Sequence, residues 1–486
     1  MMAVVSIILV SVIQYVVAQT KYGIYGASKK EAFQIAEAGV DFYRWYLSHN
    51  VTGKSSSQVR DFWENGHPLA VSTPACGQPG AYEVEYKDSS GGALGKYCLE
   101  VTQPSDWSTA VTIKSTAWTY KYPNNKVVIQ ARLRRSAWSE FMILADGMFR
   151  LSSDTVINGK MHSNTGIHFD GVAYNIVTSS ANTTYCDIDS DVTSSQTCKD
   201  ETGKSGHVKP GVWTSWANEY NSNLHSAVFR AGKTFPATEY IFNNILTDFS
   251  LMRDVGWGPS KNVINNCTSS GCYFDNTGEG RNIILNSNGT FNVCTVNAYD
   301  SSTNGITSYL RNSGSGTCSS CSDSRCQKTF TIPNNGVIYV EDNMWLEGTI
   351  NGKKISLVAA DLNVPGAEKN VFFKNSLRYT NYDGQDVIGV SSQNNIEFVR
   401  DSANDLRIDG AILAKDGRVG RNNYGNTLNS ITINGSVASR GRINFGFTDG
   451  TGYRTRDLIF DNNLLYSPPP YYPTGSQYLL DLWEEL

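Results

Sequence analysis

The residues with the most evident chemistry are ten cysteines spread over the 486-residue chain. They are Cys76, Cys98, Cys186, Cys198, Cys267, Cys272, Cys294, Cys318, Cys321 and Cys326. An even number of cysteines in polar, Gly- and Ser-rich segments predicts disulfides, which persist in exterior proteins. Cys186/Cys198 and Cys267/Cys272 would close short loops, and Cys76–Cys98 is a candidate staple for the strands around it. Spacing alone does not assign the remaining pairs.

Two of these segments also invite a metal-binding interpretation. Cys318, Cys321 and Cys326 have the spacing of three zinc ligands, but no fourth ligand is evident nearby, so we expect disulfides there. Residues 187–191 (Asp-Ile-Asp-Ser-Asp) have the spacing that opens a calcium loop, yet Val192 occupies the position of the turn glycine. We therefore expect a solvated acidic turn at 187–191, and no metal site in the chain.

The sequence contains no recognisable catalytic constellation. Nucleophile elbows, phosphate-binding loops and paired zinc histidines are not found. His162 and His168 lie near Asp170, where polar residues on the outer face of a sheet are the expected structure. Charged residues make up 18% of the chain and the net charge is −4, so no basic surface for nucleic acid is predicted. We expect no enzyme, no cofactor and no nucleic-acid partner.

The N-terminal segment constrains function more than any other feature. Residues 1–18 carry no charge, and a helix of that length spans about 27 Å, enough to cross a hydrocarbon core. A cleaved signal peptide is the alternative, because Val16-Val17-Ala18 resembles a cleavage site, but no Lys or Arg precedes the apolar run. The side chains expected to contact lipid or copies of the same segment are Val5, Ile8, Leu9, Val12, Tyr15 and Val16.

An amphipathic helix is predicted to follow. Ser28-Lys29-Lys30-Glu31 has the form of a capping box. Phe33, Ala36, Val40, Tyr43 and Leu47 then recur at helical spacing and form one apolar stripe. Between the two helices, Gly23 and Gly26 each weaken helix by about 1 kcal/mol relative to Ala, so a kink or an unwound link is expected. The predicted segments are 1–27, apolar with a glycine break, and 28–50, amphipathic.

Residues 32–39 (Ala-Phe-Gln-Ile-Ala-Glu-Ala-Gly) resemble the AF-x-x-AEAG stretch of minor-pilin-type N-termini. The succession of apolar segment, amphipathic helix and β-rich head is similar to that of type IV pilins and pseudopilins, over about the first fifty residues. The resemblance implies a prepilin peptidase, storage in the inner membrane, and polymerisation by pilus assembly machinery. Val5 departs from the Glu of most major pilins, and no basic leader precedes Met1, so we expect the chain to be already mature.

The remainder of the chain is predicted to be mainly β. Residues 51–148 would form a pilin-like head, an antiparallel sheet with strands at 82–86, 95–103, 109–116 and 126–135 that packs on the apolar stripe. A repeat of apolar, polar, Gly and alternating apolar residues follows at 157–169, 408–419 and 433–445, and more loosely at 350–358 and 387–398. It favours a β-solenoid of the parallel β-helix kind over 149–181 and 332–460, with a β-sandwich as the alternative. A disulfide-rich insertion is predicted at 182–331.

The last segment, 461–486, is rich in Pro and Tyr at its start. Leu479, Leu482, Trp483 and Leu486 fall at helical spacing, which predicts a short helix. Such a helix is too short to be stable alone, so we expect it to dock on its own body or on the next subunit.

Together these features predict a structural subunit of an extracellular type IV pilus-like filament at the cell surface. The chain would be anchored in the membrane before assembly and would polymerise with copies of itself through its apolar helix. One alternative is a low-copy minor pilin or adhesin that binds a surface or a glycan. Another is a membrane-tethered β-helix enzyme that acts on polysaccharide.

Overall fold

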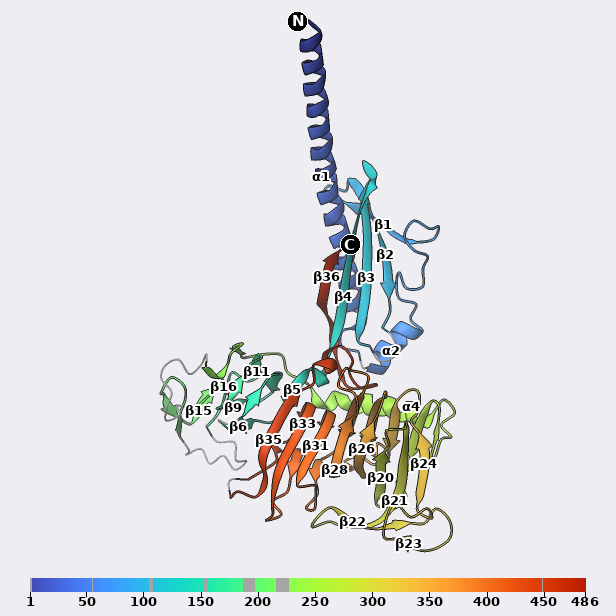
Figure 1. Cartoon of the computed structure of the whole chain (residues 1–486), viewed down its shortest axis with the longest axis vertical. Helices are drawn as coiled ribbons and strands as arrows, with labels where there is room; N and C mark the ends of the chain where they lie inside the picture. The colour runs from blue at the N-terminus through green and yellow to red at the C-terminus, as the bar shows by residue number, and fades with distance from the viewer. Residues whose placement is uncertain are drawn as a thin grey trace. The chain divides into compact units, whose positions relative to one another are not determined.

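The computed structural model describes residues 2–54, 56–104, 108–152, 155–186, 197–215, 227–447 and 449–486 (Figure 1). The acidic turn predicted at 187–191 lies outside these residues. The chain divides into two compact units. The head unit comprises Met1–Ser136 together with Thr474–Leu486, and the ladder unit comprises Ala137–Pro473. The predicted head at 51–148 therefore extended too far along the chain and lacked the C-terminal segment.

α1 (Met2–Val51) is one uninterrupted helix, drawn in dark blue in Figure 1. The break predicted at Gly23 and Gly26 is wrong, because about 1 kcal/mol per glycine is small beside a hydrogen-bond ladder that continues on both sides. The predicted capping box is also wrong. Ser28 is an interior helical residue, buried, with its Oγ 3.4 Å from Oγ1 of Thr119.

The head unit also contains α2 (Ser56–Glu64) and a five-stranded sheet. Its strands, in spatial order, are β1 (Tyr82–Lys87), β2 (Ala93–Thr102), β3 (Ala110–Thr119), β4 (Tyr122–Ala137) and β36 (Thr474–Glu485). β1 to β4 pair antiparallel, close to the four predicted strands. The disulfide between Cys76 and Cys98 ties the loop before β1 to β2.

The predicted C-terminal helix is wrong, since β36 is a strand at the edge of this sheet. The N–H of Leu486 donates to the carbonyl oxygen of Val128 at 3.0 Å, and Arg132 lies 2.6 Å from Asp481. Positions on β4 rise as those on β36 fall, so the two strands run in opposite directions. A short helix gains little by itself, whereas an open sheet edge offers a row of backbone partners. The tail thus docks on its own body.

Two ladders of parallel strands form the body of the ladder unit, and their strands lie side by side in Figure 1. The first ladder contains, in spatial order, β17 (Lys233–Thr234), β11 (Val177–Ser179), β8 (Lys160–Ser163), β5 (Phe141–Ala145), β33 (Thr427–Ser439), β31 (Asp405–Ala414), β29 (Val387–Ser392), β27 (Lys354–Ala359), β25 (Val337–Val340) and β19 (Gly271–Phe274). The second contains β20 (Gly280–Leu285), β26 (Met344–Ile350), β28 (Val371–Tyr379), β30 (Ile396–Phe398), β32 (Val419–Arg421) and β34 (Ile443–Asn444). Their apolar side chains enclose one continuous core. Other strands of the unit pair antiparallel, as β20 does with β21 (Thr290–Asp300).

The repeat found in the sequence sets the register of these strands. Ile408 pairs with Ile433 and Gly410 with Gly435, as the aligned repeats require. Gly435 has φ of +155°, and a Cβ there would lie 1.9 Å from the carbonyl oxygen of Gly410. At a corner, Oδ1 of Asn343 accepts from the N–H of Asn370, whose own Oδ1 accepts from the next asparagine, Asn395. Stacked asparagines thus satisfy the backbone where the strands turn.

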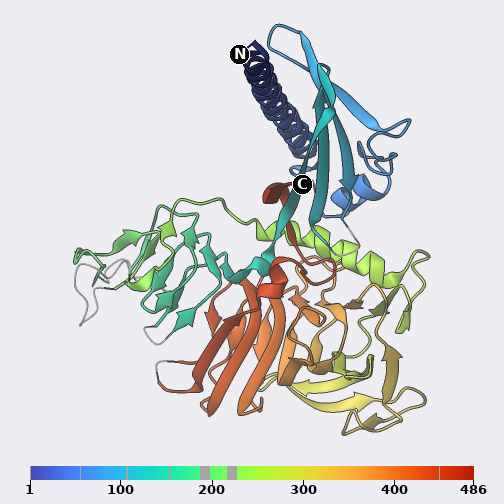
Figure 2. The same ribbon diagram turned by 45° about the horizontal axis from the view of Figure 1, so that its top comes forward.

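The path of the chain through the ladder unit begins in the middle of the first ladder. From β5 the chain adds strands outward to β17, crosses through α4 (Ile245–Trp257), and restarts at β19 at the opposite end. It then returns strand by strand until β33 pairs with β5. Figure 2 shows α4 lying across the strands, where Ile245, Phe249 and Met252 are buried against the outer face of the first ladder.

The predicted insertion at 182–331 is corrected by these pairings. β17, β19 and β20 belong to the two ladders, and the apolar residues of β19 and β20 continue the core. The disulfides in this stretch are Cys186–Cys198, Cys267–Cys272, Cys294–Cys321 and Cys318–Cys326. The three cysteines with zinc-like spacing are therefore all oxidised.

The ladder unit contains further strands and short helices. They are β6 (Phe149–Leu151), β7 (Val156–Ile157), β9 (Ile167–Phe169), β10 (Val172–Ala173), β12 (Thr183–Tyr185), β13 (Cys198–Lys199), β14 (Ser205–Gly206), β15 (Val208–Pro210), β16 (Val212–Trp213), β18 (Asn266–Thr268), β21 (Thr290–Asp300), β22 (Gly305–Leu310), β23 (Thr317–Cys318), β24 (Gln327–Thr331) and β35 (Gly452–Phe460), with short helices η1 (Trp138–Glu140), η2 (Phe242–Asn244) and η3 (Asn462–Leu465).

Candidate assembly surface

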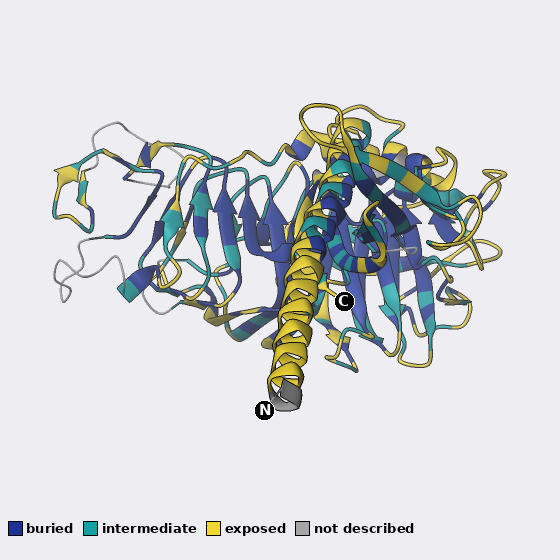
Figure 3. Cartoon of the chain, turned by 90° about the horizontal axis from the view of Figure 1, so that it is seen from above, coloured by how far each residue is buried: buried dark blue, intermediate teal, exposed yellow. Residues whose placement is uncertain are grey.

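The N-terminal half of α1 is an exposed apolar rod. Figure 3 shows this half as exposed along its described length, in contrast to the part of α1 that meets the sheet. The predicted contact residues Val5, Ile8, Leu9, Val12, Tyr15 and Val16 are all more than half exposed. Burying such a side chain gains about 1.5–3 kcal/mol, so this surface is stable only when lipid or protein covers it. Val5–Val51 contains a helical window long and apolar enough to cross a membrane.

Polar side chains within the rod bond to the helix itself. Oγ of Ser11 donates to the carbonyl oxygen of Ile7 at 2.9 Å, and Oγ1 of Thr20 donates to that of Val16 at 2.8 Å. Nε2 of Gln19 donates to the hydroxyl of Tyr15. These bonds lower the cost of moving the side chains of Ser11, Gln19 and Thr20 into an apolar environment.

The C-terminal half of α1 has the opposite character. Ala36, Val40, Tyr43 and Leu47 of the predicted stripe are buried against the sheet, and Phe33 is half-buried. The structure therefore divides the predicted assembly residues into two groups. Those before residue 17 face outward, and those from 33 to 47 hold the head unit together.

Gly39 lies where α1 packs tightly on the sheet. A Cβ on Gly39 would lie 2.4 Å from Oγ of Ser115 and 2.9 Å from Cδ2 of Tyr97. Sequence reasoning quoted this glycine within residues 32–39 but assigned it no role. Its signal was the run of small residues around it, which permits close packing of a helix on a sheet.

β36 fastens the tail to α1 and α2. The ring of Trp483 packs edge-on against Phe33, with centroids 5.7 Å apart, and Nε1 of Trp63 donates to the hydroxyl of Tyr478 at 3.0 Å. Burial raises the pKa of Tyr478. The predicted docking residues Leu479, Leu482, Trp483 and Leu486 remain at least 40% exposed. The buried anchor is Tyr478, which sequence reasoning missed because it counted residues at helical rather than strand spacing.

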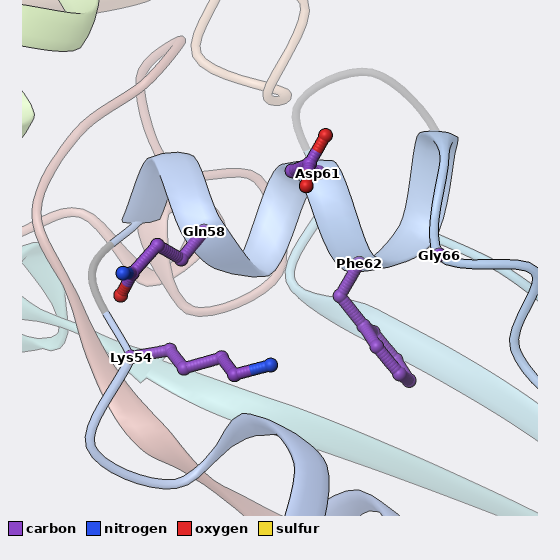
Figure 4. A pocket seen from close by; sticks show the side chains of 5 residues that line it. All are labelled: Lys54, Gln58, Asp61, Phe62 and Gly66. Carbon is purple, nitrogen blue, oxygen red and sulfur yellow. The ribbon is translucent and has the colours of Figure 1, made fainter.

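Two hollows open among the described residues of the head unit. Lys54, Gln58, Asp61, Phe62 and Gly66 line the first, at the end of α1 and along α2 (Figure 4). Nζ of Lys54 lies 5.7 Å from the centroid of the Phe62 ring, which places the cation over an apolar wall. Glu37, Val40, Asp41, Arg44, Leu480 and Trp483 line the second, between α1 and β36. We call it the α1–β36 groove.

His162 and His168 lie outside the apolar core, as predicted, but both are buried because other side chains cover them. The ring of Tyr240 packs against His162, and that of Trp213 stacks on His168. Nε2 of His168 lies 2.6 Å from Oγ of Ser215 and 3.2 Å from Oδ1 of Asp170. A serine–histidine–aspartate relay uses both ring nitrogens, whereas Nδ1 of His168 has no partner among the described residues. Burial lowers the pKa of His162 to about 4. The ring of His162 is therefore neutral near pH 7.

A solved pilin structure aligns with most of this chain at low similarity. No family model and no curated protein matches the chain. The competence-associated pilin ComZ from Thermus thermophilus aligns with a TM-score of 0.27 and 11% sequence identity, over 94% of this chain and 97% of that chain. The two chains are thus of similar length. The structure itself contains the two features that the resemblance to type IV pilins implied: α1, apolar over its N-terminal half, and an antiparallel sheet packed on its C-terminal half.

Proposed function

We propose that this chain is a structural subunit of an extracellular, type IV pilus-like filament that assembles from copies of itself. Before assembly the apolar half of α1 would anchor the subunit in the inner membrane, where a prepilin peptidase and pilus assembly machinery would act on it. In the filament the same residues would pack against those of neighbouring subunits, and the head and ladder units would face outward.

The observation that carries this proposal is the contrast within α1. One half is buried on its own sheet, and the other half exposes a predominantly apolar surface on which Ser11 and Thr20 bond to the helix backbone. A surface of this kind requires lipid or identical neighbours. Because α1 is continuous, the same segment can first lie in the bilayer and then pack in a bundle of identical helices, without refolding.

For the ladder unit we propose the β-solenoid architecture and a role in display rather than catalysis. Parallel pairing, the shared register of the repeats and the stacked asparagines support the solenoid. The ring of His168 is buried and is bonded through Nε2 alone among the described residues, which argues against acid–base chemistry at His168, Asp170 and Ser215. A stack of this kind is a rigid outer body that tolerates variation at its turns.

Shearing surface filaments from cells, pelleting them and identifying peptides by mass spectrometry tests the proposal. We expect the wild-type chain in the pellet. The variant Val12→Asp places a charge in the apolar surface and should be absent from it, whereas Val12→Leu should assemble normally. Finding the wild-type chain only in the membrane fraction and not in the pellet, or a mature N-terminus at Gln19, would contradict a filament subunit.

A further inference from the structure

The α1–β36 groove carries an acidic pair next to an apolar wall. Glu37 and Asp41 are one helical turn apart on α1, and the side chains of Leu480 and Trp483 on β36 form the opposite wall. Trp483 is 40% exposed although it packs on Phe33. Arg44 also lines the groove, so the three charged side chains leave one net negative charge. Among the described residues, neither Glu37 nor Asp41 forms an ion pair or a side-chain hydrogen bond.

The apolar half of α1 carries a single opposite charge. Lys21 is the only charged residue among the first 28. Val17, Ile24 and Tyr25 lie three or four positions from it, on the same face of the helix, and each is more than 40% exposed. The nearest acid along the helix is Glu31, ten residues and about 15 Å away. Lys21 has no ion-pair partner in the described part of its own chain.

A charge of this kind becomes costly when identical helices cover it. An unpaired lysine removed from water in an apolar bundle loses its hydration without compensation, so it must meet an acid from a neighbouring copy. The α1–β36 groove supplies two acids together with apolar walls that suit Val17, Ile24 and Tyr25. Lys29 is a weaker candidate, because its Nζ already lies 2.9 Å from Oε1 of Glu485.

We propose that the α1–β36 groove binds the Lys21 region of a second copy of this chain and sets the register between subunits. The inference rests on the proposed filament function. Lys21 of one subunit would pair with Glu37 and Asp41 of the next, which fixes an axial offset of about 24–30 Å between them at 1.5 Å per residue. The acid missing at Val5 is then not needed for register, because the ion pair lies beyond the apolar run.

Charge reversal and exchange test this register directly in intact cells. Lys21→Glu should lower the yield of sheared filaments about tenfold, and so should the pair Glu37→Lys and Asp41→Lys, because each places like charges together. Combining all three substitutions should restore the yield to within about threefold of wild type. Lys30→Glu, on the same helix, is the matched control and should leave the yield unchanged.

A cross-link gives a second readout that does not depend on yield. Cells that express a Lys21→Cys chain and an Asp41→Cys chain with different tags should form a mixed, disulfide-linked dimer in filaments. Lys30→Cys with Asp41→Cys shortens the offset by about 13 Å and should not. Filaments that tolerate Lys21→Glu, a triple variant that stays defective, or a stronger cross-link in the control pair would overturn the inference. Absence of the wild-type chain from filaments would instead overturn the proposed function.

Discussion

The two halves of α1 belong to one helix but differ in which of their apolar side chains are buried. From residue 5 to 25 every apolar side chain is exposed, whatever its direction. From 32 to 51 a single stripe is buried, and the exposed face is polar apart from Trp45. A helix that is apolar on all sides is stable in lipid or in a helix bundle, whereas an amphipathic helix packs one face against a single partner surface. The difference teaches that assembly and folding are assigned to separate stretches of the same element.

The largest effect that could break this comparison is a matched pair of isoleucine truncations. Ile35 is fully buried and Ile8 is 58% exposed. Ile35→Ala should lower the free energy of unfolding of the head unit by about 2–5 kcal/mol, and Ile8→Ala should change it by less than about 0.5 kcal/mol. Urea unfolding of the full chain in detergent measures both. Equal losses would show that the two halves are not distinct.

Lowering the pH should destabilise the ladder unit through His162, which lies outside the head unit and α1. The buried ring of His162 has its pKa lowered to about 4, below the ordinary value of 6.5. Between these values the unfolded chain binds more protons, so stability is present above pH 6.5 and falls towards pH 4, by about 3 kcal/mol in all. His162→Gln should flatten this slope in urea unfolding measured at each pH. A head-unit transition that moves by the same amount would contradict the assignment.

The glycine at the helix–sheet contact gives the next largest effect. Gly39→Val would force side chains against Ser115 and Tyr97 and should cost the head unit about 1–3 kcal/mol. Thermal unfolding followed by near-ultraviolet circular dichroism measures the loss. A neutral result would mean that α1 does not approach the sheet as closely as described.

Loss of one buried hydrogen bond at the tail should cost less. Tyr478→Phe removes the acceptor of the Trp63 Nε1–H bond and should lower head-unit stability by about 1 kcal/mol. The exposed Leu479→Ala serves as its control, with little expected change in the same urea titration. If Leu479→Ala were the more damaging substitution, the strand assignment of β36 would be in error.

The smallest expected effect comes from Gly26, in the exposed half of α1, where a side chain has room that it lacks at Gly39. Nothing lies within 4 Å of a Cβ built on Gly26, and α1 is helical there. Gly26→Ala should therefore stabilise α1 by about 0.5–1 kcal/mol, seen as increased helix content by far-ultraviolet circular dichroism in detergent. A loss of helix content would contradict a continuous α1 and support the predicted break at this position.

The features that sequence reasoning predicted well are those with strong local periodicity. The stripe from Ala36 to Leu47, the first four strands of the head and the pairing of the repeats at 408 and 433 all follow from spacing of apolar residues and glycines. The local disulfides at Cys186 and Cys267 follow from loop length.

Features that depend on distant segments were missed. β36 reads as a helix by spacing, but the free edge of β4 turns it into a strand. Gly23 and Gly26 suggest a break only if their local cost is considered apart from the helix on both sides. Likewise, no local pattern shows that β33 returns to pair with β5, or that Glu37 and Asp41 share a groove with Trp483.

Electron cryomicroscopy of sheared and pelleted filaments tests the central claim most directly. The account predicts a core of bundled helices in which residues 5–25 of each subunit contact only other copies of the same segment and the groove residues of neighbours, with the head and ladder units outside. Filaments that lack this chain, or a map in which the apolar half of α1 lies on the outer surface, would contradict it.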